Sequence, residues 1–124
     1  MIDFEETAEF RKDFKFLLKR YRTLEEDFEI MKKFTLIPVF EKGLESSALV
    51  FIEGFCGEEH VSIKIRKFSC RALKGRGAAS GIRVICVWEK TKQKLTFIQI
   101  YIKSDCENED RSRLKLFIEK INNC

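Results

Sequence analysis

The chain of 124 residues is long enough for one domain with a buried core, and residues 1–124 are taken as a single domain. Its hydrophobic content of 44%, with only one proline and six glycines, excludes a low-complexity or disordered chain. No apolar run reaches the roughly 18 residues that a membrane span needs, and the acidic start MIDFEETAEF lacks the features of a signal peptide, so we expect a cytoplasmic protein with no membrane partner.

Apolar residues at helical spacing predict two helices at the start of the chain. The first spans residues 5–21, and its apolar face consists of Phe10, Phe14, Leu17, Leu18 and Tyr21. The second spans residues 24–34 and begins at a capping box in which Thr23 and Glu26 bond to each other's backbone amides. Because only two residues separate the helices, we expect an αα-hairpin that ends before Pro38.

The apolar period then changes to two, which predicts strands. Residues 48–55 are apolar enough for a strand at a sheet edge, and residues 61–66 alternate between apolar and basic side chains. The segment GIRVICVW, residues 81–88, is apolar on both faces after Arg83, as a central strand should be. A polar hairpin, EKTKQK, leads to a last strand over residues 95–103.

The last strand and the helix after it complete the expected fold. In residues 95–103 one face holds Ile98, Ile100 and Ile102, and the other holds Gln99, Tyr101 and Lys103. Leu114, Phe117, Ile118 and Ile121 predict a C-terminal helix. Helices grouped ahead of strands indicate an α+β fold, in which an N-terminal αα-hairpin packs on one face of a small antiparallel sheet. The other face is expected to display Lys64, Arg66, Gln99, Tyr101 and Lys103.

The charge is distributed unevenly, although the net charge is only +4. Residues 60–103 carry eleven basic residues and one acidic residue, Glu89. Their net charge is therefore +10, against −5 for residues 1–59 and −1 for residues 104–124. Such a chain is expected to form one basic face that suits a polyanion or an acidic partner. The alternative is a basic sheet surface that only contacts solvent.

The basic side chains on the predicted open sheet face suit a phosphodiester. Several cations stabilise the charge of a pentacoordinate phosphorane, and an aromatic ring stacks on an unpaired base. RNA supplies its own nucleophile, the 2′-OH, so cleavage needs a base, an acid and cations but no metal or other cofactor. A lysine whose pKa is lowered by neighbouring positive charges can serve as the base. The candidate catalytic residues are Lys64, Arg66, Arg83, Tyr101 and Lys103.

Four further cations lie between the predicted strands, in a segment marked by glycines. Lys67, Arg71, Lys74 and Arg76 are expected to steer RNA or to hold an acidic partner. Other chemistries find little support in the sequence. The five cysteines are widely spaced and the only histidine is His60, so the close pairs of a zinc site are missing. Glu89 is the only acid of the basic region, which argues against carboxylate chemistry.

Three runs of the sequence resemble the RelE/ParE superfamily of type II toxin–antitoxin toxins, and most of all its RelE-like mRNA interferase branch. They are EFRKDFKFLLKRYRTLEEDF, KIRKFSCRALKGRGAASGIRVICVWE and FIQIYIKSDCENEDRSRL. The resemblance covers roughly residues 9–34 and 61–121, with Cys86 at a position where the family usually has tyrosine. Residues 35–59 have no counterpart. The resemblance implies a fold with two N-terminal helices on a small antiparallel sheet, often with a C-terminal helix.

The resemblance also implies a function, that of a metal-independent endoribonuclease cutting mRNA, usually on the ribosome. Lys64 and Arg66 match the family's basic strand pair, and Arg83 matches the arginine of its SGxR-like segment. Lys103 lies near the position of a further cation. The family's tyrosine often lies in the C-terminal helix, so Tyr101, after which no tyrosine follows, is a weaker match.

Such toxins are silenced by a small antitoxin protein, which wraps the toxin and can cover its basic face. The implied partners are therefore a cognate antitoxin, in a toxin–antitoxin hetero-oligomer, and mRNA with or without the ribosome. Two alternatives stay open. One is a ParE-like toxin that acts on gyrase, and the other is a non-catalytic module of the same fold that binds RNA or a protein partner.

Overall fold

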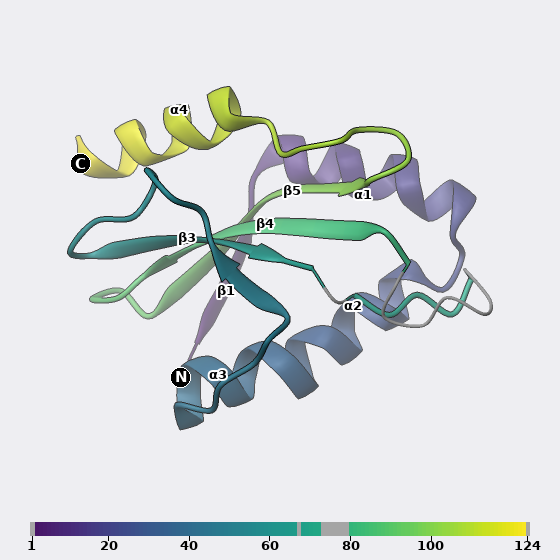
Figure 1. The fold of residues 1–124 in the computed structure, drawn as a ribbon, viewed down its shortest axis with the longest axis horizontal. Coiled ribbons are helices and arrows are strands. Elements are labelled where there is room, and N and C mark those ends of the chain that lie inside the picture. The colour runs from purple at the N-terminus through teal and green to yellow at the C-terminus, as the bar shows by residue number, and fades with distance from the viewer. Residues whose placement is uncertain (1, 67, 73–79, 124) are drawn as a thin grey trace.

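The computed structural model describes residues 2–66, 68–72 and 80–123 (Figure 1). In chain order its elements are β1 (Asp3–Glu6), α1 (Ala8–Arg20), α2 (Leu24–Met31), the π-helical segment η1 (Lys32–Leu36), α3 (Ile37–Lys42), β2 (Leu49–Phe51), β3 (His60–Ile65), β4 (Ile82–Glu89), β5 (Lys94–Ile102) and α4 (Arg111–Asn122). The fold is therefore α+β, as the order of the elements in the sequence predicts. None of the helices in these residues is long and apolar enough to cross a membrane.

The strands form one five-stranded mixed sheet in the order β1-β5-β4-β3-β2. β4 is the central strand and β2 lies at an edge, as the sequence predicts. The prediction of a purely antiparallel sheet is wrong, because β1 runs parallel to β5. Residues 3–6 extend the sheet rather than start the first helix, which begins only after Thr7. The Thr7 hydroxyl accepts a hydrogen bond from the Phe10 amide at 3.1 Å and caps α1.

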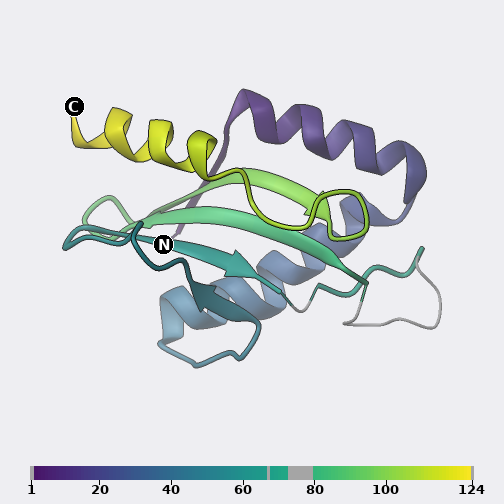
Figure 2. The ribbon, with the colours of Figure 1, turned by 45° about the horizontal axis from the view of Figure 1, so that its top comes forward.

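Both faces of the sheet are covered by helices (Figure 2). On one face, α1 and α2 pack on the sheet through an aromatic cluster in which Phe28 and Phe97 meet edge to face, with ring centroids 4.9 Å apart. On the opposite face, Leu114 of α4 packs with Ile85 and Val87 of β4. The expectation that the second face is open is therefore wrong over the part that α4 covers.

The second helix of the chain extends beyond its predicted end. α2 continues through η1 into α3, so residues 35–42 are helical and Pro38 lies in the first turn of α3. A proline ring normally clashes with the carbonyl four residues earlier. The π-helical bonding of η1, in which the Ile37 amide donates to the Lys32 carbonyl, provides a wider turn just before the proline. The helix instead ends at Gly43, whose φ of 67° is left-handed.

The capping box predicted at Thr23 does not form. The Thr23 side chain makes no cap hydrogen bond to α2. Its hydroxyl instead donates to the Asp27 carboxylate at 2.7 Å and accepts from the Ala72 amide at 2.9 Å. It therefore ties a distant segment to the start of α2. Three residues, 21–23, connect the two helices instead of the two that the sequence predicts, and the packed αα-hairpin stays a prediction.

A β-bulge in β5 changes which side chains share a face. Ile85 pairs with Gln99 but the next residue, Cys86, pairs with Phe97, so Ile98 is the extra residue. Ile98 consequently packs with the α4 side of the sheet, whereas Ile100 packs with the α1–α2 side. The prediction that Ile98 and Ile100 share a face is wrong for this reason.

Candidate nucleic-acid interface

Three predicted site residues form a row across one end of the sheet. In the antiparallel registers Arg83 pairs with Tyr101, and Val84 pairs with Ile65. The next residue after Ile65 is Arg66, whose carbonyl accepts a hydrogen bond from Nη1 of Arg83 at 2.9 Å. Arg66, Arg83 and Tyr101 therefore lie side by side on three neighbouring chain segments. We call this set the Arg66–Arg83–Tyr101 row.

The row faces the side of the sheet that carries α4. Val84 and Cys86 are part of the core beneath α1 and α2, so the alternating positions Arg83 and Ile85 point the other way. Lys103 follows directly after β5, where its amide donates to the Gly81 carbonyl at 2.8 Å. The structure thus brings the predicted cations of three strands to one end of the sheet.

Three of these cations have no carboxylate partner. Among residues 2–66, 68–72 and 80–123, no acidic side chain forms an ion pair with Arg66, Arg83 or Lys103. The hydrogen bonds of both arginines go to backbone carbonyls, such as that of Ser47, 3.3 Å from Arg66 Nη2. A guanidinium has five N–H donors, so both arginines retain donors for an anion.

Lys64, in contrast, is neutralised. Its ammonium lies 2.6 Å from a carboxylate oxygen of Glu109, and the two side chains are 23% and 2% exposed. The other oxygen of Glu109 accepts from Nε of Arg111 at 2.9 Å. Burial alone would raise the pKa of Glu109, but the hydrogen bonds from Lys64, its own backbone and Arg111 outweigh burial and hold that pKa below its usual value. Glu109 is therefore ionised at neutral pH.

Tyr101 is packed more deeply than the sequence suggests. It is 6% exposed and belongs to the core beneath α4, so its ring is not available for stacking on a nucleobase. Burial, together with the negative charge of Glu109, raises the pKa of Tyr101 to about 12. The phenol keeps its proton at neutral pH. It can donate a hydrogen bond or a proton, but it is not poised to act as a base.

Glu109 is the site residue that the sequence analysis missed. The acid that follows it, Asp110, caps α4 by accepting from the Arg113 amide at 3.1 Å. The neighbouring Asp110 amide donates to Oε1 of Gln99 at 2.7 Å, which draws the turn onto the sheet. A polar glutamine at a buried strand position was the available signal, since such a side chain needs a partner.

The candidate loop cations divide into two groups. Lys67, Lys74 and Arg76 lie outside the described residues. Arg71 is described, and its Nε donates to Asp27 at 2.8 Å while its backbone amide donates to the same carboxylate at 2.9 Å. Its guanidinium also pairs with Glu26. These bonds fasten the segment of residues 70–72 to α2, so Arg71 has a structural role in addition to any contact with a partner.

Replacing Asp27 by asparagine is expected to lower the free energy of unfolding at pH 7 by about 2 kcal/mol, because it weakens charged hydrogen bonds at a site with 4% side-chain exposure. Burial opposes ionisation, but the bonds from Thr23 and Arg71 leave the pKa of Asp27 lowered. A lowered pKa stabilises the fold above the unfolded-state value of about 3.9. The deficit should therefore shrink as the pH falls through the folded-state pKa. Urea unfolding at a series of pH values measures it, and a pH-independent deficit would contradict the assignment.

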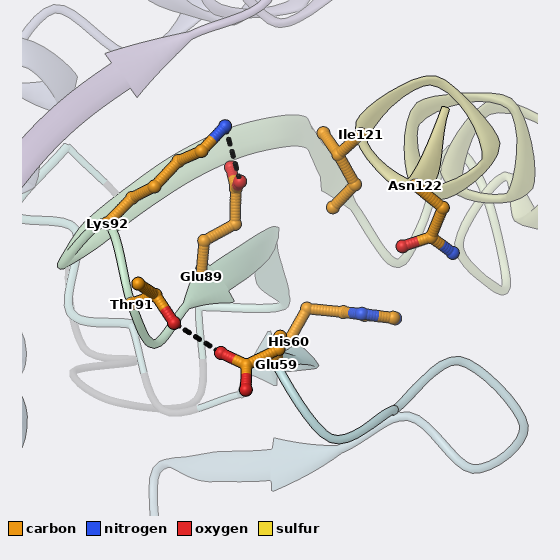
Figure 3. Close-up of a pocket in the computed structure, with 7 residues that line it drawn as sticks. All are labelled: Glu59, His60, Glu89, Thr91, Lys92, Ile121 and Asn122. Carbon is orange, nitrogen blue, oxygen red and sulfur yellow. Dashed lines mark hydrogen bonds and ion pairs between the residues drawn. The ribbon is translucent and has the colours of Figure 1, made fainter. Parts of the chain in front are cut away.

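A separate polar pocket of about 250 Å³ lies at the opposite end of the sheet (Figure 3). Its lining residues are Glu59, His60, Glu89, Thr91, Lys92, Ile121 and Asn122. Glu89 is held there by Lys92, whose Nζ lies 3.5 Å away, and Thr91 donates to Glu59. Within the described part of the chain, no group of three or more His, Cys, Asp or Glu side chains could hold a metal ion.

The described contacts thus define a cationic site at one end of the sheet. It consists of the Arg66–Arg83–Tyr101 row, Lys103 and the Lys64–Glu109 pair. Unbalanced guanidinium groups beside a protonated phenol suit an anion with several acceptor oxygens, such as a phosphate. Comparisons with known protein families, with curated proteins and with solved structures find no match to this chain.

Proposed function

We propose that the protein is a metal-independent endoribonuclease that cleaves mRNA, free or on the ribosome, as the toxin of a type II toxin–antitoxin system. The observation that carries the proposal is the Arg66–Arg83–Tyr101 row, which joins a protonated phenol to two arginines that have no carboxylate partner among the described residues. The resemblance of the sequence to RelE-like toxins supports the same function.

The proposed chemistry uses the 2′-OH of the substrate. The 2′ oxygen attacks phosphorus, the bond to the 5′ oxygen breaks, and the products are a 2′,3′-cyclic phosphate and a 5′-OH end. The guanidinium groups of Arg66 and Arg83 bind the non-bridging oxygens and stabilise the charge that develops there. Water takes the 2′ proton. The phenol of Tyr101 protonates the leaving 5′ oxygen and then regains a proton from solvent.

The proposed biological setting is the cytoplasm, with a cognate antitoxin as the protein partner. The region of residues 60–103 has a net charge of +10, so an acidic antitoxin segment would find a complementary surface there. Such a segment would also cover the row and block RNA. A toxin–antitoxin hetero-oligomer is the expected resting state.

A model RNA should be cleaved by the purified protein in the presence of EDTA, and the same RNA with a 2′-deoxy nucleotide at the cleaved position should resist. The reason is that the nucleophile belongs to the substrate. Gel electrophoresis of end-labelled RNA measures both, and primer extension on cellular mRNA after induction extends the test to the cell. Equal cleavage of the 2′-deoxy substrate would contradict the proposed chemistry. Intact RNA together with DNA damage signalling would instead indicate a gyrase target.

A second candidate, a non-catalytic module that binds RNA, is favoured by two specific observations. Lys64, the lysine of the basic strand pair, is held in an ion pair with the buried Glu109, and Tyr101 is not poised to act as a base. The row would then bind phosphate without cleaving it. Tight, salt-sensitive RNA binding by a protein that is neither toxic nor nucleolytic would select this reading.

A further inference from the structure

The Glu109 carboxylate is unusual for its burial, since only 2% of its side chain is exposed. A buried carboxylate is costly unless cations and hydrogen bonds compensate it. Lys64 reaches it from β3 with a separation of 2.6 Å, and Arg111 reaches it from α4 at 2.9 Å. The amide of the next residue, Asp110, donates to Gln99, which lies two residues before Tyr101 in β5, and the charge of Glu109 adds to burial in raising the pKa of Tyr101. One carboxylate therefore connects two strands of the candidate site with α4.

The backbone holds Glu109 in this position from both sides. Before it, the turn after β5 is closed by the Asp105 and Cys106 amides, which both donate to the Ile102 carbonyl, at 2.9 and 3.1 Å. After it, the Asp110 amide donates to the side chain of Gln99 at 2.7 Å. Asp110 also caps α4, so the helix start does not need the charge of Glu109. Helix capping therefore does not explain why Glu109 is buried.

We propose that Glu109 is a positioning residue of the candidate ribonuclease site, where its carboxylate holds the Lys64 ammonium beside the Arg66–Arg83–Tyr101 row and places a negative charge on the side of β5 that carries Tyr101. This inference rests on the function proposed above, in which Tyr101 protonates the leaving oxygen. Glu109 acts through its neighbours and does not itself touch the RNA, because Lys64 occupies one of its oxygens and Arg111 the other.

Two observations separate this role from others. The pKa of Glu109 is lowered and both of its oxygens face cations, so it is a poor base for a 2′-OH. The burial of Tyr101 and the charge of Glu109 act in the same direction on the phenol. Removing that charge therefore makes the proton of Tyr101 easier to lose, an effect that a purely structural role would not predict.

The inference predicts opposite changes in RNA binding and RNA cleavage. Glu109 is the negative charge that neutralises Lys64, so its removal leaves one more unbalanced cation beside the row. RNA should then bind equally well or up to about fivefold more tightly. Cleavage should nevertheless slow by about 10- to 100-fold, because Lys64 loses its fixed position beside the row.

The test compares Glu109→Gln with Glu107→Gln, which removes the same charge two residues earlier at an exposed position. Both are made in a Tyr21→Phe background, so that Tyr101 is the only tyrosine left. Three quantities are measured: the single-turnover cleavage rate, the Kd of a 2′-deoxy analogue, and the ionised fraction of the phenol at pH 10 by ultraviolet absorbance. With the pKa of Tyr101 near 12, about one phenol in a hundred is ionised at that pH before the change.

Support requires that Glu109→Gln slows cleavage, keeps or tightens binding and raises the ionised fraction severalfold, while Glu107→Gln changes none of the three. Glu109→Asp keeps the charge and should restore the low ionised fraction. The inference is overturned if Glu109→Gln folds and leaves the ionised fraction unchanged. It is also overturned if Glu109→Gln and Glu107→Gln cleave a cleavable RNA at the same rate.

A second variant guards against loss of folding. Lys64→Gln/Glu109→Gln removes both charges of the buried pair, and the cation that still loses its partner is Arg111, whose side chain is 63% exposed. It should show the same rise in phenol ionisation, measured after circular dichroism has verified the fold. If the parent protein cleaves no RNA, the proposed endoribonuclease function fails. The phenol measurement then decides alone whether the charge of Glu109 acts on Tyr101.

Discussion

Replacing Arg83 by alanine should slow RNA cleavage by about 10²- to 10³-fold, the usual cost of removing one donor that stabilises transition-state charge. Arg83 lies at the middle of the Arg66–Arg83–Tyr101 row, and no carboxylate in the described chain balances its charge. Arg83 is half-buried at the start of β4, and its Nη1 donates to the backbone carbonyls of Arg66 and Ile82. The fold should therefore survive, because water can replace Arg83 at the Arg66 carbonyl.

Two variants make this test specific. Arg22→Ala removes the same charge from an exposed position near α2 and should cleave RNA at the parental rate. Arg83→Lys keeps the charge but loses the planar fork of donors, and it should retain part of the activity. Single-turnover cleavage rates and circular dichroism are measured for all three. If the Arg83→Ala protein is folded and cleaves at the parental rate, Arg83 does not contribute to cleavage and the proposed site is wrong in this respect.

Replacing Phe97 by alanine should destabilise the fold by about 3–5 kcal/mol, the typical cost of deleting a large buried aromatic ring. Phe97 is fully buried, and its ring centroid lies 5.9, 5.5 and 4.9 Å from those of Phe4, Phe10 and Phe28. These partners come from β1, α1 and α2. The loss should therefore loosen the attachment of all three elements to β5.

Urea unfolding measures this loss, and Phe16→Ala provides the matched control. Phe16 lies on α1 but is 62% exposed, so the same substitution should change the free energy of unfolding by less than about 0.5 kcal/mol. Equal effects of the two substitutions would show that the aromatic cluster does not stabilise the fold as its packing implies.

The elements that the sequence predicts well are those whose signal is local. β3, β4 and β5 have a clear period of two or continuous apolar runs, and α4 has a clear helical face. β1 has only one apolar residue in its four, Phe4. Its pairing with β5 depends on residues about 90 positions away, which no local pattern shows.

The candidate site was predictable to the same extent. Strand alternation was enough to place Arg83 and Tyr101 on one face, and antiparallel pairing set them side by side. The bulge at Ile98 was not predictable from alternation, because one extra residue exchanges the faces without changing the composition. Glu109 was also missed, because its position depends on how the turn after β5 folds back onto Gln99.

The pairing of β1 with β5 has a consequence for the order in which the protein can fold. Asp3 pairs with Lys94, and the Thr7 amide donates to the Phe97 carbonyl at 3.1 Å. During synthesis, the first strand must therefore stay unpaired until more than three quarters of the chain has been made. Contacts of such large sequence separation form late, because the entropy of closing the long loop is lost first. Arg66, Arg83 and Tyr101 likewise come together only after β5 emerges, so a nascent chain that has not yet reached the end of β5 has no assembled row.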